Sequence, residues 1–282
     1  MGIDAGTAWQ RENRKIFDNI VENYDKVRWD YPDELFADII RYSGTCNDKK
    51  ALEIGAGTGK ATTPFLDAGY AVTAVEMGAN MTEFLNAKFK DRISFSVINS
   101  TFEDAVLEDN SYDLIYAASA FHWVDPEIGC PKVLRLLKSG GVFALFRNNS
   151  IPDESDDLYE EIQAVYDLHY YSHYKPNNRP VKLADMSRED FLKPEEIFRG
   201  FRFESLEQYG FVDIVMKLYD AFRTYDTENY IKLIDTYNDH RALPDENREA
   251  LYAGLRKVIE KHGGQLKLNF VYQLYMGRKE NY

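Results

Sequence analysis

Cysteine is scarce in this chain, which has only Cys46 and Cys130 among its 282 residues. Two cysteines cannot build the disulfide framework of a small secreted domain, and they suit a reducing compartment. Neither a signal peptide nor an apolar run of membrane-spanning length is evident. We therefore expect a cytoplasmic protein with no membrane partner.

Basic residues are also few, since 34 Lys and Arg stand against 47 Asp and Glu, for a net charge of −13. No run of Lys or Arg is longer than two residues. An acidic surface repels a phosphate backbone. We therefore expect no nucleic-acid partner.

Several catalytic signatures are missing. His169 and His173 are spaced i, i+4 but lack the Glu of the zinc pattern H-E-x-x-H, so we predict no metal site. The chain has neither a G-x-S-x-G elbow nor the P-loop pattern, in which Gly-Lys-Ser/Thr follows a glycine after a four-residue gap. Aromatic residues, in contrast, are plentiful at 14%, with 20 Tyr and 17 Phe. They suit the wall of a small-molecule pocket, although they also fill ordinary cores.

Strand and helix patterns alternate through the first half of the chain. Strands are predicted at 50–55, 71–76, 93–98, 112–117 and 142–146, and helices at 60–67, 81–88 and 131–137. This order favours an α/β fold with a doubly wound, Rossmann-like sheet. Residues 212–218 and 266–276 are two further predicted strands, which makes seven. The strict alternation in 266–276 predicts an antiparallel edge strand or hairpin partner.

We expect one domain over residues 1–282. Its predicted parts are N-terminal helices at 13–48, a cofactor-binding core at 50–150, a helical cap insertion at 151–208 and C-terminal strands and helices at 209–282. The cap interrupts the alternation and is rich in Tyr and His. A surface insertion that contacts no ligand is the alternative interpretation.

Three glycines spaced by two, Gly55, Gly57 and Gly59, follow the first predicted strand and precede a helix. Glycine permits unusual backbone angles and close approach, and such a turn aims free N–H groups at a ligand. The third glycine comes one position too early for the dinucleotide fingerprint, and Lys60 stands where that fingerprint has Gly or Ala. The stretch therefore predicts a cofactor loop, with a ligand-free turn as the alternative.

Glu76 ends the second predicted strand, 21 residues after Gly55. An acid at this place can accept hydrogen bonds from both ribose hydroxyls of an adenosine, and Met77 can lie on the adenine face. A solvated charge at the strand end is the alternative. A carboxylate at the end of this strand is common to NAD sites and S-adenosylmethionine (SAM) sites, so it does not distinguish the two cofactors.

Glu53-x-Gly55-x-Gly57-x-Gly59 resembles motif I of the class I SAM-dependent methyltransferases. Residues 118–126, which include His122 and Trp123, resemble the HW segment of the small-molecule group (methyltransferase type 11, trans-aconitate methyltransferase-like). Residues 136–141 are similar to the LLxPGG turn of that group, with Ser139 in place of proline. Asp113, at the start of the fourth predicted strand, matches an acidic residue of that group. Tyr24 matches a tyrosine that closes over the cofactor in the same group.

The resemblance implies an enzyme that uses SAM as its cofactor, releases S-adenosylhomocysteine and methylates a small molecule, with carboxylic acids as one acceptor class. It assigns a set of cofactor-binding residues: Tyr24, Glu53, Gly55, Ala56, Gly57, Thr58, Gly59, Glu76, Met77, Thr101, Phe102, Ala118 and Phe121. Thr101 stands where the family often has Asp, and the ring of Phe102 is expected beside the adenine.

Four residues are candidates for the acceptor side, namely His122, Trp123, Arg147 and Tyr170. His122 follows the fourth strand, and an imidazole with an ordinary pKa near 6.5 could act as a catalytic base. It could equally hydrogen-bond the loop or pack by the cofactor. Arg147 can bind a substrate carboxylate through two parallel hydrogen bonds, or pair with one of the chain's many acids.

Two other functional classes stay open at this stage. One is an NAD-dependent oxidoreductase of similar fold, and the other is a SAM-binding protein without catalytic activity. The sequence leaves the acceptor unnamed and is compatible with a monomer or a homodimer.

Overall fold

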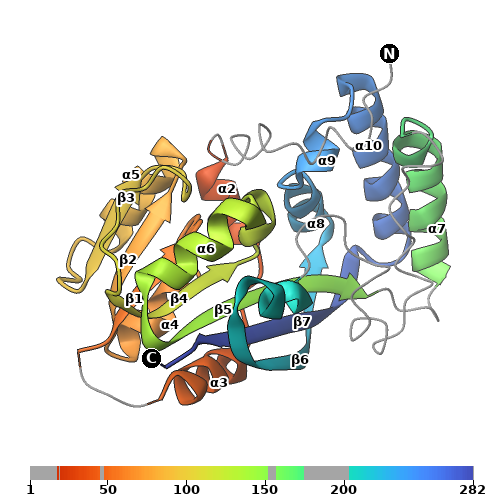
Figure 1. Cartoon of the computed structure of the whole chain (residues 1–282). Coiled ribbons are helices and arrows are strands. Elements are labelled where there is room, and N and C mark those ends of the chain that lie inside the picture. Colours follow the sequence, from red (N-terminus) through yellow and green to blue (C-terminus); the bar gives the residue numbers. More distant parts are fainter. Residues whose placement is uncertain (1–17, 19, 45–47, 152–156, 175–202, 282) are drawn as a thin grey trace. The chain divides into compact units, whose positions relative to one another are not determined.

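The structure is a computed structural model that describes residues 18, 20–44, 48–151, 157–174 and 203–281 (Figure 1). The chain forms two compact units that interleave along the sequence. The sheet unit comprises Asp30–Asn148, Arg188–Tyr219 and Tyr272–Tyr282. The helical unit comprises Met1–Trp29, Asn149–Ser187 and Asp220–Val271. The domain boundaries expected above stay a prediction.

Seven strands form one sheet in the order β3-β2-β1-β4-β5-β7-β6. They are β1 (Lys50–Ile54), β2 (Ala71–Glu76), β3 (Phe95–Asn99), β4 (Tyr112–Ala118), β5 (Leu137–Ile151), β6 (Phe211–Asp226) and β7 (Gln265–Lys279). The first five pair in parallel, and the C-terminal strands are antiparallel. This mixed, mostly parallel sheet confirms the predicted Rossmann-like fold.

The order of the strands fixes where a ligand can bind. From β1 the chain continues to β2 and β3 in one direction, and to β4 and β5 in the other. In such sheets ligands bind beyond the carboxyl ends of the strands, at the point where the order reverses. That point is between β1 and β4, so the loops that follow Ile54, Glu76 and Ala118 are brought together there.

Helices of the sheet unit are α3 (Asp33–Ser43), α4 (Thr62–Asp67), α5 (Ala79–Lys88) and α6 (Pro126–Leu136), with 3₁₀ turns at Phe121–Trp123 and Phe203–Tyr209. α6 begins five residues before the predicted helix 131–137. The carboxylate of Asp125 accepts the N–H of Glu127 at 3.2 Å, and Pro126 occupies the first helical position. Both features favour a helix start at that point.

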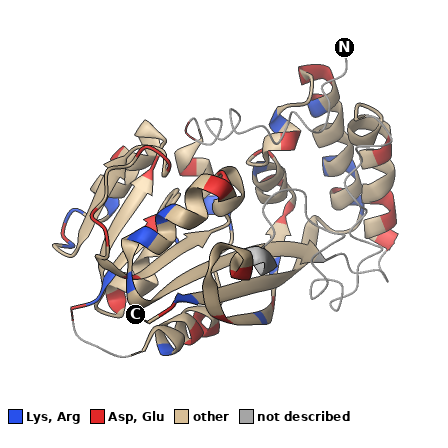
Figure 2. Ribbon diagram, in the orientation of Figure 1, with Lys and Arg blue, Asp and Glu red and all other residues tan. Residues whose placement is uncertain are grey.

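The helical unit contains α2 (Val21–Val27), α7 (Asp157–Tyr166) with a π-helical turn at Asp167–Tyr171, α8 (Thr227–Ile234), α9 (Asn238–Arg241) and α10 (Asp245–Lys261). Acidic residues occur along α7, with Asp157 and Glu160 in its first turn (Figure 2). The described part of the predicted cap 151–208 is helical from Asp157 to Tyr171. Residues 152–156 and 175–202 of that segment lie outside the described residues.

The last strand corrects the prediction of an edge position. β7 lies between β5 and β6 in the sheet, and β6 is at the edge. Every residue from Phe270 to Gly277 in β7 is buried. The alternation of apolar residues is therefore not an alternation of exposure, because Gln273 and the tyrosines of the strand are buried as well.

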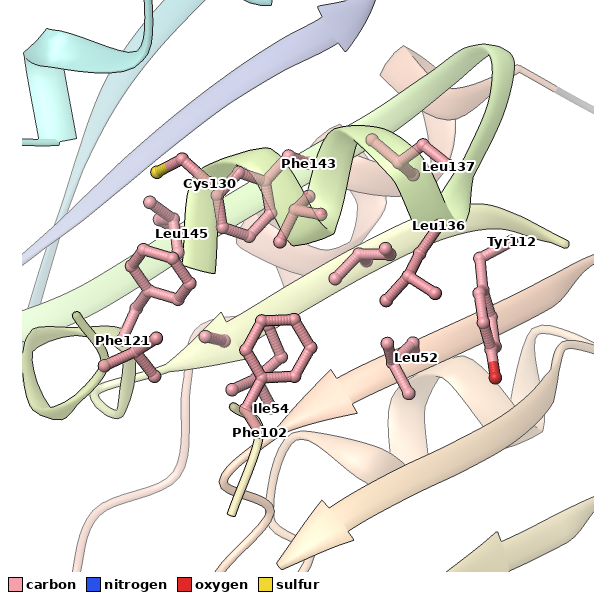
Figure 3. Close-up of a cluster of buried hydrophobic side chains, with 14 of the residues drawn as sticks. Leu52, Ile54, Phe102, Tyr112, Phe121, Cys130, Leu136, Leu137, Phe143 and Leu145 are labelled. Carbon is pink, nitrogen blue, oxygen red and sulfur yellow. The ribbon is translucent and has the colours of Figure 1, made fainter. Parts of the chain in front are cut away.

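Apolar side chains from β1, β4, β5 and α6 form a core of the sheet unit (Figure 3). Leu52, Phe143 and Leu145 are fully buried in it, and each such side chain stabilises the fold by about 1.5–3 kcal/mol. Phe121, from the loop after β4, fills the same core. The core therefore anchors a loop at the carboxyl end of the sheet.

Candidate functional site

The glycine loop adopts a backbone that other residues reach only with strain. Gly55, Gly57 and Gly59 have φ values of +70°, +55° and +76°. A Cβ on Gly55 would lie 2.6 Å from the Cβ of Ala120, in the loop after β4. One on Gly59 would lie 2.6 Å from the ring of Phe89. Glycine is therefore needed both for the left-handed conformation and for close approach.

Glu76 lies against this loop, and the paired residues Ile54 and Val75 directly precede Gly55 and Glu76 on the neighbouring strands β1 and β2. Its Oε2 accepts the N–H of Gly57 at 2.8 Å, and its Oε1 accepts the N–H of Gly78 at 2.8 Å. An ionised carboxylate can accept about four hydrogen bonds. The two N–H groups therefore fix the orientation of this carboxylate at the end of β2.

Glu53 is buried behind the loop. Its carboxylate accepts hydrogen bonds from the hydroxyls of Thr62, at 2.5 Å, and Tyr116, at 3.0 Å. Burial raises the pKa of Glu53 to about 7, an effect that these two donors partly oppose. These bonds join β1 to β4 and to the start of α4. The contacts fit a residue that supports the glycine loop.

The loop after β3 holds Thr101 and Phe102. The hydroxyl of Thr101 donates to Asp104 at 2.7 Å and accepts the N–H of Asp104, so it stabilises a turn. Phe102 is only 4% exposed, and its ring belongs to the core (Figure 3). The prediction that this ring flanks an adenine conflicts with that burial, and the backbone of the loop is the better candidate for adenine contacts.

A buried lysine forms hydrogen bonds with the backbone of the same loop. Lys132 of α6 donates to the carbonyls of Phe102, Glu103 and Ala105 at 2.7, 3.1 and 2.6 Å. Its ammonium also lies 5.1 Å from the centre of the Phe102 ring. Burial lowers the pKa of Lys132. Sequence reasoning missed this lysine, because nothing in the sequence of α6 indicates that it meets the loop after β3.

The loop after β4 brings Ala118, Ser119 and Phe121 to the same end of the sheet. Ser119 has a φ of +52°, which is uncommon for a residue other than glycine. Its Oγ accepts the hydroxyl proton of Tyr31 at 3.1 Å, and its N–H donates to the carbonyl of Phe146 at 2.8 Å. Such conformations cluster at functional sites. The sequence carries no signal for this conformation of Ser119.

His122 lies in the 3₁₀ turn Phe121–Trp123, with its ring 4.9 Å from that of Trp123. Burial and then the positive charge of Arg147 lower the pKa of His122 to about 4. The imidazole is therefore neutral at pH 7 and a weak base. This corrects the assumption of an ordinary pKa near 6.5 on which its predicted role as a base depended.

Arg147 follows the buried part of β5 and reaches β7. Its Nε donates to the Oε1 of Gln273 at 2.9 Å, and the amide of Gln273 donates to the hydroxyl of Tyr275 at 3.3 Å. Gln273 is a buried partner of Arg147 that the sequence did not indicate.

Two predicted site residues, Tyr24 and Tyr170, belong to the helical unit instead. Tyr24 lies on α2, where the Arg28 guanidinium is 4.9 Å from its ring centre. Tyr170 is buried, and its hydroxyl donates to the Asp239 carboxylate at 2.5 Å. Their predicted contacts with a cofactor and a substrate stay predictions.

Asp239 belongs to a hydrogen-bonded group of polar side chains in the helical unit. Its Oδ1 is 2.9 Å from the Nδ1 of His240, whose Nε2 is 2.9 Å from the hydroxyl of Tyr166. Burial alone would raise the pKa of Asp239, but His240 and Tyr170 hold it at about 2. These side chains therefore form a polar network inside the helical unit.

Within the described residues, no three His, Cys, Asp or Glu side chains are grouped as a metal site would require. In the same part of the chain, no helix has the length and apolar character needed to cross a membrane.

Comparison with known sequences identifies a methyltransferase domain at residues 52–145. An uncharacterised methyltransferase of Mycobacterium tuberculosis is 33% identical over 142 residues, which are 50% of this chain and 56% of that protein. The chain thus spans about half the length of this relative. An uncharacterised methyltransferase of Schizosaccharomyces pombe is 25% identical over 255 residues, which are 87% of this chain and 88% of the relative.

Solved structures support the fold. A candidate type II methyltransferase of Anaeromyxobacter dehalogenans has a TM-score of 0.59 at 18% identity, covering 90% of this chain and 99% of its own. Phosphoethanolamine N-methyltransferase 2 of Haemonchus contortus, in complex with phosphomonomethylethanolamine and S-adenosylhomocysteine, has a TM-score of 0.51 at 14% identity, covering 94% of this chain and 58% of its own. Residues 52–145 therefore match a methyltransferase domain, and they lie on the Rossmann-like sheet described above.

Proposed function

We propose that this protein is a SAM-dependent methyltransferase whose acceptor is a small molecule bearing a carboxylate. The observation that supports it best is the carboxylate of Glu76, held between the N–H groups of Gly57 and Gly78 beside the glycine loop. An adenosine bound at the end of the sheet needs such an acceptor for its ribose hydroxyls. The methyltransferase domain makes SAM the matching cofactor.

The residues present fit that cofactor. Gly55–Gly59 would approach it closely through the backbone, with Ala56 and Thr58 between the glycines, and Glu76 would bind its ribose. Met77, Thr101 and the backbone of Phe102 would border the adenine. Ala118 and the backbone at Phe121 would lie beside the reacting end, because the Phe121 ring is buried in the core. SAM supplies a methyl carbon already activated by its positive sulfur, so the protein contributes mainly alignment and the exclusion of water.

The electrostatics of His122 support this choice of acceptor class. Arg147 carries a positive charge that lowers the pKa of His122 to about 4, together with burial. A neutral imidazole of so low a pKa accepts a proton poorly at pH 7. A carboxylate needs no base, because it is already an anion, and a guanidinium binds it well. A carboxylic acid of the trans-aconitate type fits these requirements.

Calorimetric titration with SAM, S-adenosylhomocysteine and NADH in parallel tests the cofactor. We expect the first two to bind and NADH not to bind. Thermal stabilisation should accompany binding, by about 2.7 kcal/mol at a hundredfold excess over the dissociation constant. Binding of NADH alone would contradict the proposal and favour an oxidoreductase.

Transfer of labelled methyl to a panel of small carboxylic acids, with their amides as controls, tests the acceptor. Labelling of the acids and not of the amides is expected. Binding of SAM without transfer to any acid would indicate a binding protein without this activity.

His122→Ala tests the contribution of the imidazole. We expect S-adenosylhomocysteine to bind as in the wild type, because the glycine loop and Glu76 are unchanged. Turnover on the identified acceptor should fall, since the side chain shapes the site beside Arg147. Unchanged turnover would remove His122 from the reaction.

A further inference from the structure

Ser119 has a backbone conformation that is unusual for its residue type. Among the residues that the structure describes, four other than glycine have a positive φ, namely Asp48, Asn110, Ser119 and Asp213. Asn and Asp are enriched in this region, and serine is not. Glycine would adopt the φ of +52° without strain. A strained serine where glycine would be unstrained indicates that the side chain itself has a role.

The place of Ser119 is the point where the loops after β1 and β4 meet. It directly follows Ala118, the last residue of β4. The next residue, Ala120, packs against the glycine loop, since a Cβ on Gly55 would lie 2.6 Å from the Cβ of Ala120. Ligands of such sheets bind at this end, between β1 and β4. Ser119 is only partly buried there, so a ligand can reach its side chain.

The hydroxyl of Ser119 is oriented by Tyr31, whose phenol donates to its Oγ at 3.1 Å. The Tyr31 ring is itself fixed edge-on by three other rings, with centroids at 6.2, 4.9 and 5.7 Å, which are those of Phe36, Phe146 and Tyr272. A serine hydroxyl that accepts one hydrogen bond still has its own proton to donate. For that proton the described part of the chain supplies no acceptor. The bond from Tyr31 also makes the Ser119 hydroxyl a stronger donor, because hydrogen bonds in a chain polarise one another.

We infer that the Ser119 hydroxyl donates a hydrogen bond to a carboxylate oxygen bound at the end of β4, and that Tyr31 is the residue that positions it. A carboxylate is the matching ligand group, because a hydroxyl binds an anionic oxygen about twice as strongly as a neutral one. Two carboxylates are candidates, that of the acceptor and that of the amino-acid part of SAM. For both, the inference rests on the proposed function.

Ser119→Ala and Ser119→Gly together separate loss of the hydroxyl from a defect in folding. Both remove the hydroxyl, but only glycine relieves the positive φ. We therefore expect Ser119→Gly to unfold at a higher urea concentration than Ser119→Ala. Ligand affinity should nevertheless fall by the same factor in both, about tenfold or more, because a hydrogen bond to a charged group is lost. An affinity loss that follows the stability of the two variants would overturn the inference.

Two ligands identify the source of the carboxylate. Weaker binding of S-adenosylhomocysteine, with wild-type binding of 5′-methylthioadenosine, which lacks the amino-acid part, would assign the bond to the cofactor. A rise in KM for a carboxylic acid acceptor, with wild-type affinity for S-adenosylhomocysteine, would assign it to the acceptor. An equal loss for S-adenosylhomocysteine and 5′-methylthioadenosine would overturn the inference, because a structural defect does not distinguish the carboxylate.

Tyr31→Phe tests the positioning role, because it keeps the ring and the Ser119 hydroxyl and removes the donor between them. Binding of the same ligand should weaken roughly threefold in the wild-type background and not at all in Ser119→Ala, since the phenol acts through Ser119. An equal effect in both backgrounds would overturn the role of Tyr31. Ser96→Ala is a matched control on β3, where the Ser96 hydroxyl donates to that of Thr73 at 3.2 Å. Its ligand affinity should stay at the wild-type value.

The proposed function and the role of Ser119 fail in different ways. A wild type that binds no S-adenosylhomocysteine and methylates no acid would overturn both. Binding and turnover that are present in the wild type and unchanged in Ser119→Ala and Ser119→Gly would overturn only the role of Ser119.

Discussion

Replacing Gly55 by alanine tests whether the glycine loop is shaped for a ligand or only for the fold. Gly55 has a φ of +70°, and an L-residue in this conformation costs about 1–2 kcal/mol. The added Cβ would also meet the Cβ of Ala120 at 2.6 Å, against a normal carbon–carbon separation of about 3.5–4.0 Å. Overpacking of this kind costs about 1–3 kcal/mol more.

Gly69 offers a matched control in the turn between α4 and β2. Its φ is +88°, but a Cβ there would have nothing within 4 Å. Gly69→Ala should therefore lose only about 1–2 kcal/mol of unfolding free energy through backbone strain. Gly55→Ala should lose about 2–5 kcal/mol, because the strain and the overlap with Ala120 add.

Ligand affinity separates the two variants further. The overlap must push the loop after β1 away from the loop after β4, where the cofactor is proposed to bind. A loss of 1.4 kcal/mol in binding corresponds to about a tenfold weaker affinity, and we expect at least this for S-adenosylhomocysteine in Gly55→Ala. Gly69→Ala should bind as the wild type does. Urea unfolding and calorimetry measure both quantities. Wild-type affinity in Gly55→Ala would refute the reasoning.

Two further variants test the support of the site. Burial raises the pKa of Glu53 from its ordinary 4.5 to about 7, so the folded state keeps a proton that the unfolded state releases. The unfolding free energy should fall by roughly 3 kcal/mol as pH rises from 4.5 to 7, and Glu53→Gln should abolish this fall in urea titrations at several pH values. An equal change of unfolding free energy with pH in Glu53→Gln and in the wild type would refute this prediction. Lys132, 8% exposed, has three carbonyl partners, so Lys132→Met should lower the unfolding free energy by about 2–4 kcal/mol. Lys138 pairs with Asp113 at 42% side-chain exposure, so Lys138→Met should cost less than about 1 kcal/mol, and equal losses would contradict the buried role.

Local patterns in the sequence determined the order of strands and helices, the glycine loop and the place of Glu76. Each depends on residues close together in the chain: apolar periodicity sets an element, glycine permits a turn, and an acid ends a strand. The carboxyl ends of parallel strands then meet by the rules of the fold. The same local reasoning placed the start of α6 too late, because Pro131 stands inside that helix while Asp125 and Pro126 begin it.

Only the tertiary structure decided the contacts that give these residues their chemistry. Gln273 meets Arg147 across 126 positions of sequence, and Tyr31 meets Ser119 across 88. The interior place of β7 depends on strands that come earlier in the chain, so its own alternation could not reveal it. The low pKa of His122 arises from burial and from the charge of Arg147, which no local pattern contains. Spacing along a chain predicts which residues share an element, whereas burial and charge depend on which elements pack together.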